Sequence, residues 1–473
     1  MTSHDPGTRP GIDPADLRTT LAVLAAVEEL PEDHPDAVAV RRATARIFKA
    51  VRKQRRRAKR AEVLAADRAV TEATATGAPG RIDDETAGLP LKARATGPIA
   101  GVLRKARSCY TCKERYTVVD AFYHQLCPSC AELHHAKRTA RTDLTGRRAL
   151  LTGGRAKIGM YIALRLLRDG AHTTITTRFP NDAVRRFAAV PDSGDWLHRL
   201  RVVGIDLRDP AQVLALADDV ASRGRLDILI NNAAQTVRRP PGSYAALLAG
   251  EREPAPELVE TITFGHLASA SLPALEQSTG ISPHAVTALA LTAATPTLEA
   301  KVDAGGLVPD TSPENSWSRV VHQIDPLELL EVQLCNQTAP FLLVSKLRPV
   351  LAASPARRKY VVNVSAMEGQ FSRRYKGPGH PHTNMAKAAL NMLTRTSAGE
   401  MFATDRILMT SVDTGWITDE RPHPTKARLA AEGFHAPLDL EDGAARVYDP
   451  IVRGEAGEDV YGCFLKDYRP SPW

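Results

Sequence analysis

The sequence lacks an apolar run long enough to cross a membrane, because a spanning helix needs about 18 consecutive apolar residues or more. The N-terminal stretch is polar and rich in proline and glycine, without the apolar centre of a secretory signal. We therefore expect a soluble cytoplasmic protein that does not bind membranes. The composition is otherwise ordinary, with 43% hydrophobic and 25% charged residues, and 473 residues suffice for one large domain with additions.

Acidic residues are missing between Arg41 and Arg60, where eleven lysines and arginines stand, and the net charge of the whole chain is +8. One interpretation is a solvated helix face that packs over acidic surface. The other is a site for nucleic acid or another polyanion. Because the run offers little aromatic surface for base stacking, the first interpretation is favoured.

Three regions follow one another along the chain. Helical periodicity covers residues 16–30 and about 35–70, and one face of the second helix carries Val40, Thr44, Ile47, Phe48 and Val51. Residues 71–100 are rich in Ala, Thr, Gly and Pro, which predicts a loosely held linker. We expect a helical basic extension with its linker at 1–105, a cysteine module at 106–140 and a nucleotide-binding domain at 141–473.

Four cysteines form two CxxC pairs that are separated by 14 residues: Cys109, Cys112, Cys127 and Cys130. This spacing is typical of a tetrahedral zinc site with four thiolate ligands, which leaves no coordination position open for catalysis. Disulfides are the competing interpretation, but nothing in the sequence suggests an oxidising compartment. Nearby histidines are alternative ligands or, more simply, surface residues: His124, His134 and His135.

Residues 148–159, RALLTGGRAKIG, predict a strand, a glycine turn and a helix in that order. The apolar residues 149–151 precede Thr152, Gly153 and Gly154, and a helical apolar pattern follows from Ile158. Glycines allow backbone amides to approach a pyrophosphate, and the helix N-terminus adds its positive dipole end. Lys157 stands where a third glycine is usual in this motif.

Strand-like runs alternate with helical stretches in the rest of the chain: 148–152, 172–177, 200–204, 226–230, 359–365, 407–412 and 459–465. Such alternation predicts an α/β fold, a Rossmann-type doubly wound parallel sheet of about seven strands. A long insertion at about 236–325 interrupts it. Insertions at the carboxyl ends of such strands often form substrate lids, so Trp317 and the Arg238–Arg239 pair either face a substrate or pack the insertion against the body.

Six segments in order resemble the short-chain dehydrogenase/reductase family over residues 144–473, apart from the insertion. They are Thr152-Gly153 with Gly159, Asp206-Leu207, the stretch Asn231-Asn232-Ala233-Ala234, Asn336, Lys387 and the stretch from Gly415 to Thr418. The resemblance implies an NAD(P) site lined by Thr152, Gly153, Gly154, Arg155, Lys157, Ile158, Gly159, Arg178, Asp206, Leu207, Asn232, Ala233, Ala234, Lys387, Gly415, Ile417 and Thr418. It also implies that Asp206 contacts the adenine, that Asn231 supports the central strand and that Lys387 holds the nicotinamide ribose.

The second strand ends in Thr176-Thr177-Arg178, without an acidic residue. A carboxylate there would hydrogen-bond the ribose 2′-hydroxyl of NAD and repel the 2′-phosphate of NADP. Arg178 can instead pair with a 2′-phosphate, and Arg155 and Lys157 would complete a basic phosphate site. NADP is therefore expected rather than NAD, unless Arg178 only caps the sheet.

The chain departs from the resemblance at the catalytic positions. The family uses a serine and a Tyr-x3-Lys pair, but Ala366 and Thr383 stand where the serine and the tyrosine are expected. An aliphatic hydroxyl is a much weaker acid than a phenol, so we expect His382 or Tyr375, from the preceding loop, to take the proton role. The alternative is that both are surface residues.

Two functions fit these residues. The first is an NADP(H)-dependent oxidoreductase that acts on a small-molecule carbonyl or alcohol with Lys387, Asn336 and a replaced proton donor. The second is a non-catalytic NADP-binding scaffold that docks nucleic acid or protein through the basic helix and the zinc module. The resemblance also implies a homo-oligomer formed by the helices on either side of the fifth strand.

Overall fold

The computed structural model describes residues 11–82, 85–239, 242–265, 302–303, 305–373 and 375–473. The chain divides into two compact units, with the boundary between Arg68 and Ala69. Among the described residues, no helix has the length and apolarity needed to cross a membrane. The middle of the expected insertion, residues 266–301, lies outside the described residues.

The first unit consists of helix α1 (Pro14–Glu28) and the greater part of α2 (Pro35–Glu72). Asp13 caps α1, because its carboxylate accepts a hydrogen bond of 2.7 Å from the backbone amide of Ala15. Ile47 and Phe48 on the apolar face of α2 are 64% and 68% exposed. This face therefore builds no core within its own unit.

The cysteine module follows the expected order. Strands β1 (Ile99–Ser108) and β2 (Arg115–Asp120) pair antiparallel, and helix α3 (Pro128–Thr139) follows them. Cys127 is the N-cap of α3 and Pro128 its first residue, so the second cysteine pair lies on the first turn of a helix.

Within the described part of the chain, the main sheet has nine strands in the order β11-β10-β9-β8-β6-β3-β4-β5-β7. All neighbours are parallel except β10 and β11. The strands are β3 (Arg148–Leu151), β4 (His172–Thr177), β5 (Leu200–Gly204), β6 (Ile228–Asn231), β7 (Glu260–Thr263), β8 (Lys359–Ser365), β9 (Ile407–Asp413), β10 (Phe464–Lys466) and β11 (Arg469–Ser471). The Rossmann-type fold is confirmed, and the two strands beyond the expected seven are the edge strands β7 and β11.

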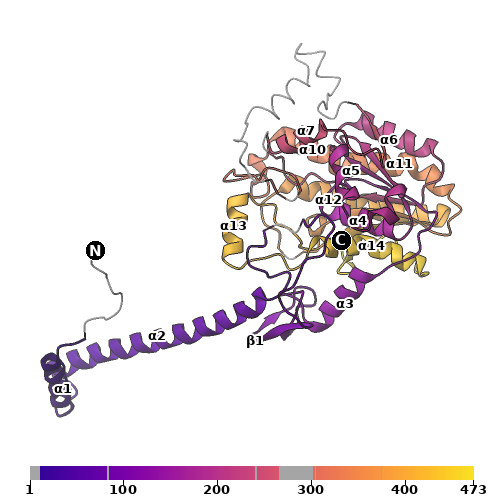
Figure 1. Cartoon of the computed structure of the whole chain (residues 1–473). Coiled ribbons are helices and arrows are strands. Elements are labelled where there is room, and N and C mark those ends of the chain that lie inside the picture. The colour runs from indigo at the N-terminus through magenta and orange to yellow at the C-terminus, as the bar shows by residue number, and fades with distance from the viewer. Residues whose placement is uncertain (1–10, 83–84, 240–241, 266–301, 304, 374) are drawn as a thin grey trace. The chain divides into compact units, whose positions relative to one another are not determined.

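Helices cover both faces of this sheet (Figure 1). One apolar core joins the sheet to α4 (Lys157–Arg168), α5 (Pro180–Ala188) and α14 (Leu440–Glu455), and it continues into the cysteine module through Leu126 and Tyr123. The other joins it to α6 (Pro210–Ser222), α11 (Ala339–Ala352) and α12 (Pro381–Asp405). Shorter helices are α7 (Ala245–Glu251), α10 (Pro326–Gln333) and α13 (His423–Ala431).

Residues 73–82 and 85–99 differ from the loosely held linker that their composition predicts. Thr74 and Thr76 are fully buried, and the Thr76 hydroxyl lies 2.8 Å from Nδ1 of His124. The Arg81 guanidinium donates hydrogen bonds of 2.8 and 2.6 Å to the carbonyl oxygens of Ala436 and Leu438. Small residues here allow close packing between the module and the C-terminal part of the sheet domain, a use that composition alone does not reveal.

Candidate active site

Strand order reverses between β4 and β6 on either side of β3, so the loops after β3 and β6 border a crevice. The glycines of the first loop are required by close packing. A Cβ on Gly159 would lie 1.9 Å from the carbonyl oxygen of Gly153, and one on Gly154 would lie 2.5 Å from Cβ of Ile175. Gly153 itself has a φ of 71°, in the region that favours glycine.

The loop after β6 is tied to this cradle. Backbone amides of Asn232 and Ala233 each donate a hydrogen bond of 3.0 Å to the Thr152 hydroxyl. The Asn232 side chain in turn donates to the carbonyl oxygens of Thr152 and Gly153, at 3.0 and 3.1 Å. These contacts bring together the residues that the sequence predicts at the two loops, and Ala234 follows directly.

Lys157 begins helix α4 with a φ of 53°, the left-handed conformation for which glycine is the usual residue. This explains why a glycine is usual here and shows that Lys157 accepts some backbone strain. Its backbone amide donates a hydrogen bond to the carboxylate of Glu85. The charge of its side chain acts on Glu420, because burial would raise the pKa of that carboxyl but Lys157 and Arg239 hold it below its ordinary value.

The expected basic phosphate site is only partly formed. The Arg155 guanidinium pairs with Asp182 at 2.5 Å, so it is already neutralised. Arg178 lies 4.6 Å from the ring centroid of Tyr244 and 5.6 Å from that of Phe179. Burial would lower the pKa of Arg178, but Tyr244 raises it, which keeps the guanidinium charged. Among the described residues, Arg178 therefore forms no ion pair with a carboxylate, in contrast to Arg155.

Tyr244 was not identified from the sequence, because it lies in the insertion. Its ring stacks on Phe179, with centroids 5.8 Å apart and an angle of 24° between the planes. The beginning of the insertion therefore extends the wall beside the end of β4.

Asp206 and Leu207 follow β5 and are buried, at 3% and 8% exposure. The Asp206 carboxylate accepts hydrogen bonds of 3.0 and 2.6 Å from Nε and Nη2 of Arg208. Burial would raise the pKa of Asp206, but Arg208 lowers it. Its carboxylate is thus held by a neighbouring arginine, which the sequence did not predict.

Two asparagines link the central strands below the crevice. The Asn231 amide donates a hydrogen bond of 2.8 Å to the Asn363 side chain, and the Asn363 amide donates one of 2.9 Å to Thr394 on α12. Asn231 is 2% exposed. The supporting role expected for Asn231 is consistent with this buried network.

Asn336 lies in a π-helical turn, Leu334–Thr338, between α10 and α11. Such wider turns often mark functional sites. Its side chain accepts a hydrogen bond of 2.7 Å from the amide of Gln235 and donates one of 2.8 Å to the Gln235 carbonyl oxygen. Asn336 therefore fixes the loop that follows β6.

Lys387 is buried on α12, and its Nζ donates a hydrogen bond of 2.7 Å to the carbonyl oxygen of Val364 at the end of β8. Burial lowers the pKa of Lys387 to about 8, although Glu368 acts in the opposite direction. Thr383 lies one helical turn earlier, and its hydroxyl donates at 3.4 Å to the carbonyl oxygen of Thr236. Both positions of the expected pair therefore share one helix face.

The two proposed proton donors have opposite environments. Tyr375 is 72% exposed, whereas His382 is 1% exposed. Nε2 of His382 lies 3.9 Å from the Glu328 carboxylate, and neither ring nitrogen has a hydrogen-bond partner among the described residues. Burial lowers the pKa of His382, and Glu328 partly opposes the shift. Tyr375 therefore does not share the buried environment of Lys387.

The loop after β9 closes the other side of the crevice. Gly415 has a φ of 77°, and a Cβ there would lie 2.7 Å from Cδ1 of Leu438. Ile417 and Ile158 both approach Gly443 of α14, which joins this loop to the start of α4. The backbone amide of Trp416 donates a hydrogen bond of 2.9 Å to the hydroxyl of Tyr110 in the first CxxC pair. The cysteine module thus contacts the stretch that includes Thr418.

Both ends of the insertion pack against neighbouring elements at the mouth of the crevice. Trp317 stacks on His380 at the start of α12, with ring centroids 4.0 Å apart and planes 6° apart. Arg239 lies 3.9 Å from Glu420 after β9, and Arg238 lies 3.6 Å from Glu331 on α10. The sequence left open whether these residues face a substrate or pack the insertion against the body of the domain. In the structure, Trp317 and both arginines have packing contacts.

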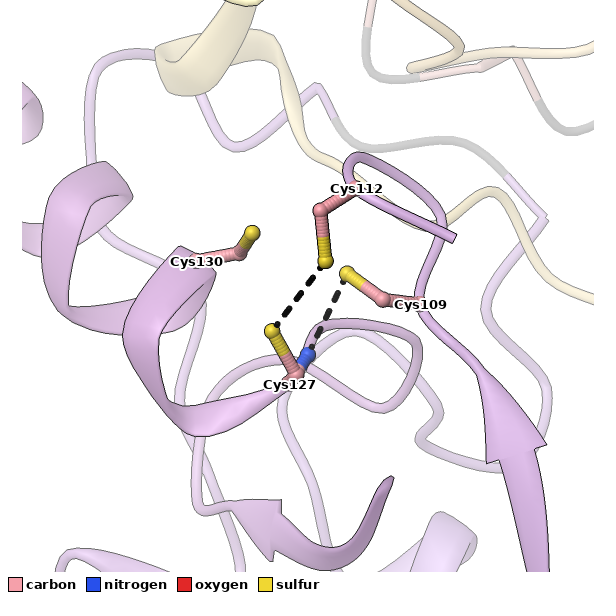
Figure 2. A group of neighbouring side chains, drawn as sticks. All are labelled: Cys109, Cys112, Cys127 and Cys130. Carbon is pink, nitrogen blue, oxygen red and sulfur yellow. Dashed lines mark hydrogen bonds between the residues drawn. The ribbon is translucent and has the colours of Figure 1, made fainter. Parts of the chain in front are cut away.

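The four predicted cysteines converge in space, and Figure 2 shows their side chains directed toward one another. Their sulfur atoms all lie within 4.8 Å of one another, and those of Cys112 and Cys127 are 3.6 Å apart. Sulfurs bound to one tetrahedral zinc at about 2.3 Å would lie about 3.8 Å apart, so this donor set fits zinc. All four are unpaired thiols.

The nearby histidines have other partners. His124 contacts Thr76, and His135 lies 3.1 Å from Asp120. His134 is fully buried, 3.8 Å from Asp442 on α14. His124 and His134 therefore contact residues outside the module, whereas His135 pairs within it.

A sequence profile described as "short chain dehydrogenase" matches residues 147–247. "Uncharacterized protein R665" of Acanthamoeba polyphaga mimivirus is 32% identical over 359 residues, which cover 73% of this chain and 71% of the viral protein. Residues 147–247 are therefore similar to the short-chain dehydrogenase/reductase family. The family match covers β3, the glycine turn, α4 and the loop after β6.

Two further proteins resemble shorter parts of the chain or only its backbone. A "Probable oxidoreductase" of Streptomyces antibioticus is 43% identical over 94 residues, which cover 19% of this chain and 30% of that protein. The solved "Pseudomonas aeruginosa RhlG/NADP active-site complex" has 20% sequence identity and a TM-score of 0.43, covering 68% of this chain and 95% of that one.

Proposed function

We propose that the chain is an NADP(H)-dependent oxidoreductase that acts on a carbonyl or alcohol. The observation that carries the proposal is the presence of Lys387, Asn336 and the glycine cradle at the carboxyl ends of β3, β6 and β8. Ligands of doubly wound sheets bind at this edge, where the strand order reverses. The nicotinamide group would supply or accept the hydride. The residues of the chain would bind the cofactor, orient the substrate and protonate its oxygen during reduction.

The cradle fits a dinucleotide pyrophosphate. Glycines at 153, 154 and 159 let the turn pack closely on its neighbours, and the first backbone amides of α4 supply hydrogen-bond donors. Lys387 would hold ribose hydroxyls with its ammonium group. Gly415, Ile417 and Thr418, on the loop after β9, would bound the nicotinamide side.

Of the two proton donors expected from the sequence, we propose His382, because its burial excludes water whereas Tyr375 is largely in solvent. If an imidazolium donates the proton, reduction should become faster as the pH falls below 6.5, since the pKa of His382 is lowered. We expect His382→Ala to lower kcat at least tenfold and to remove this acid dependence.

Stopped-flow oxidation of NADPH with a panel of aldehydes and ketones tests both the activity and this donor. Tyr375→Phe is the matched control and should leave the rate unchanged. Equal rates in the His382→Ala variant and the unmodified protein would show that the donor lies elsewhere.

Arg178 supports NADP(H) as the cofactor. A bidentate arginine–phosphate contact contributes about 1.5–3 kcal/mol, so Arg178→Ala should weaken NADPH binding about tenfold or more. NADH has no 2′-phosphate and should bind with unchanged affinity. Arg155→Ala should have a smaller effect, because Arg155 is paired with Asp182. Fluorescence titration of both nucleotides measures these dissociation constants. Equal losses of affinity for NADPH and NADH in the Arg178→Ala variant would show that Arg178 does not recognise the 2′-phosphate.

We also propose that the four cysteines hold one structural zinc ion. All four sulfurs serve as ligands, so no coordination position is left for a substrate. The thiols must stay reduced to bind metal, which suits the cytoplasm. Through Tyr110 and Trp416, the zinc would also hold the loop after β9 in place.

One observation favours a second function, binding of nucleic acid. Six basic residues line a single groove along α2, which we call the basic groove: Lys49, Arg52, Lys53, Arg56, Arg57 and Arg60. Their spacing of three and four residues places them on one face, where they can follow the phosphates of a duplex. The scaffold function would use this groove without catalysis.

Changing Arg52, Arg56 and Arg60 together to alanine should weaken binding of a 20-base-pair RNA duplex. Because each lost phosphate contact lowers the salt slope of log K by about 0.9, we expect the slope to fall by about 3. Arg41, Arg55 and Lys59 changed together give the same charge loss outside the groove. Fluorescence anisotropy measures the slopes. Equal slopes in the two triple variants would show that the basic groove has no special role and that these charges only keep the helix solvated.

A further inference from the structure

The N-terminus of α4 already holds an anion from the chain itself. The carboxylate of Glu85 accepts hydrogen bonds from the backbone amide of Lys157, the first residue of α4, and from that of Ala87, the latter at 2.7 Å. Glu85 is 7% exposed. A buried carboxylate at this position is stabilised by the positive end of the helix dipole and by charge-assisted hydrogen bonds.

The residues after Glu85 are packed on α4, and we call residues 85–89 the strap. The hydroxyl of Thr86 contacts the Tyr161 hydroxyl, which also lies 3.4 Å from the carbonyl oxygen of Leu89. Gly88 has a φ of 86°, and a Cβ there would lie 2.9 Å from Cδ1 of Leu164. Glu85 is therefore held at the helix end by neighbours that fit the helix surface.

The Lys157 amide is also a donor that the start of α4 would offer to a pyrophosphate, whereas the Ala87 amide belongs to the strap itself. A carboxylate and a pyrophosphate cannot share the Lys157 amide, because both are anions and each backbone amide has one hydrogen to donate. We propose that Glu85 is an internal competitor for the pyrophosphate site and that the strap leaves the start of α4 when the dinucleotide binds. This inference rests on the proposed NADP(H) function.

The chain that precedes the strap is anchored to the cysteine module and to the C-terminal part of the sheet domain. Residues 74–76 pack beside His124, and Arg81 is bonded to the chain at 436 and 438. The anchored part therefore ends four residues before Glu85, so release of the strap would leave the module docked. Competition at the cradle gives a way to set the cofactor concentration at which the enzyme responds.

Glu85→Gln tests the competition, because it keeps the size of the side chain and removes its charge. We expect the Kd for NADPH, measured by calorimetry, to fall about tenfold, which corresponds to about 1.4 kcal/mol. Tyr161→Phe, which loosens the strap without touching Glu85, should lower Kd in the same direction. Glu132→Gln, an exposed glutamate on α3, is the control and should leave Kd unchanged.

Hydrogen exchange supplies the second measurement. Saturating NADPH should accelerate exchange of the amides at 86–89 in the unmodified protein, since the strap leaves α4. Equal or higher Kd in Glu85→Gln, with exchange at 86–89 unaltered by NADPH, would overturn the competition while leaving cofactor binding intact. Absence of NADPH binding in the unmodified protein and in both strap variants would instead overturn the proposed function, and the inference with it.

Discussion

Replacing Cys127 with serine should abolish zinc binding and lower the Tm by about 10 °C or more. Loss of a metal is among the few single changes that cost more than about 4 kcal/mol, and each kcal/mol shifts Tm by about 2–4 °C in domains of 150–250 residues. The module depends on the metal and on its docking to the sheet domain, because β1 and β2 form only a two-stranded sheet. Its core residues Leu126 and Tyr123 are continuous with the core beside α4 and α14.

The serine variant separates metal loss from helix loss. Cys127 is the N-cap of α3 and makes no capping hydrogen bond with its side chain. Serine is a favourable N-cap, so the helix itself should gain rather than lose stability. Metal content and calorimetric Tm should be measured together, with Cys463→Ser as a control outside the cluster. An unchanged Tm, or a disulfide within the cluster found by mass spectrometry, would contradict the zinc assignment.

Replacing Lys387 with methionine should reduce kcat by at least about a hundredfold and leave Tm unchanged or higher. Methionine fills similar space but cannot donate to Val364 or to a ribose hydroxyl. Burial lowers the pKa of Lys387 to about 8, so the buried charge costs folding free energy below that pH, at about 1.4 kcal/mol per pKa unit. Activity and stability should therefore move in opposite directions.

In the unmodified protein, a rise in pH should likewise change cofactor binding and stability in opposite directions. The Lys387 ammonium is present below pH 8 and is lost above it, so cofactor binding should weaken as the pH rises through about 8. In the same interval, up to the ordinary lysine value, the free energy of unfolding should rise, because the unfolded chain binds the proton more strongly. Steady-state kinetics from pH 6 to 10 provide the measurement, with Lys376→Met as a surface control. Full activity of the Lys387→Met variant would refute the role.

Much of the fold could be predicted because its signals are local. Continuous apolar runs mark the central strands, and every residue of β8 and β9 is indeed buried. The cysteine spacing likewise predicted the gathering of the four sulfurs. The edge strand β7 was missed because Glu260–Thr263 is polar and mostly exposed, which gives no strand signal.

The parts of the site that were missed depend on contacts between distant residues. Glu85 reaches Lys157 across 72 residues, and its segment has the composition of a linker. Tyr244 reaches Arg178 from within the insertion. The basic phosphate site was overstated for the same reason, since the sequence gives no sign that Asp182 neutralises Arg155. Oligomerisation stays a prediction, with Phe341 on α11 and Met392 on α12 exposed.

A crystal structure of the protein grown with NADPH tests the central claim most directly. We expect a pyrophosphate on the amides at the start of α4, with Glu85 displaced. We also expect the 2′-phosphate in contact with Arg178 and the nicotinamide ribose in contact with Lys387. A structure at saturating NADPH in which Glu85 still accepts from Lys157 and the cradle holds no nucleotide would contradict it.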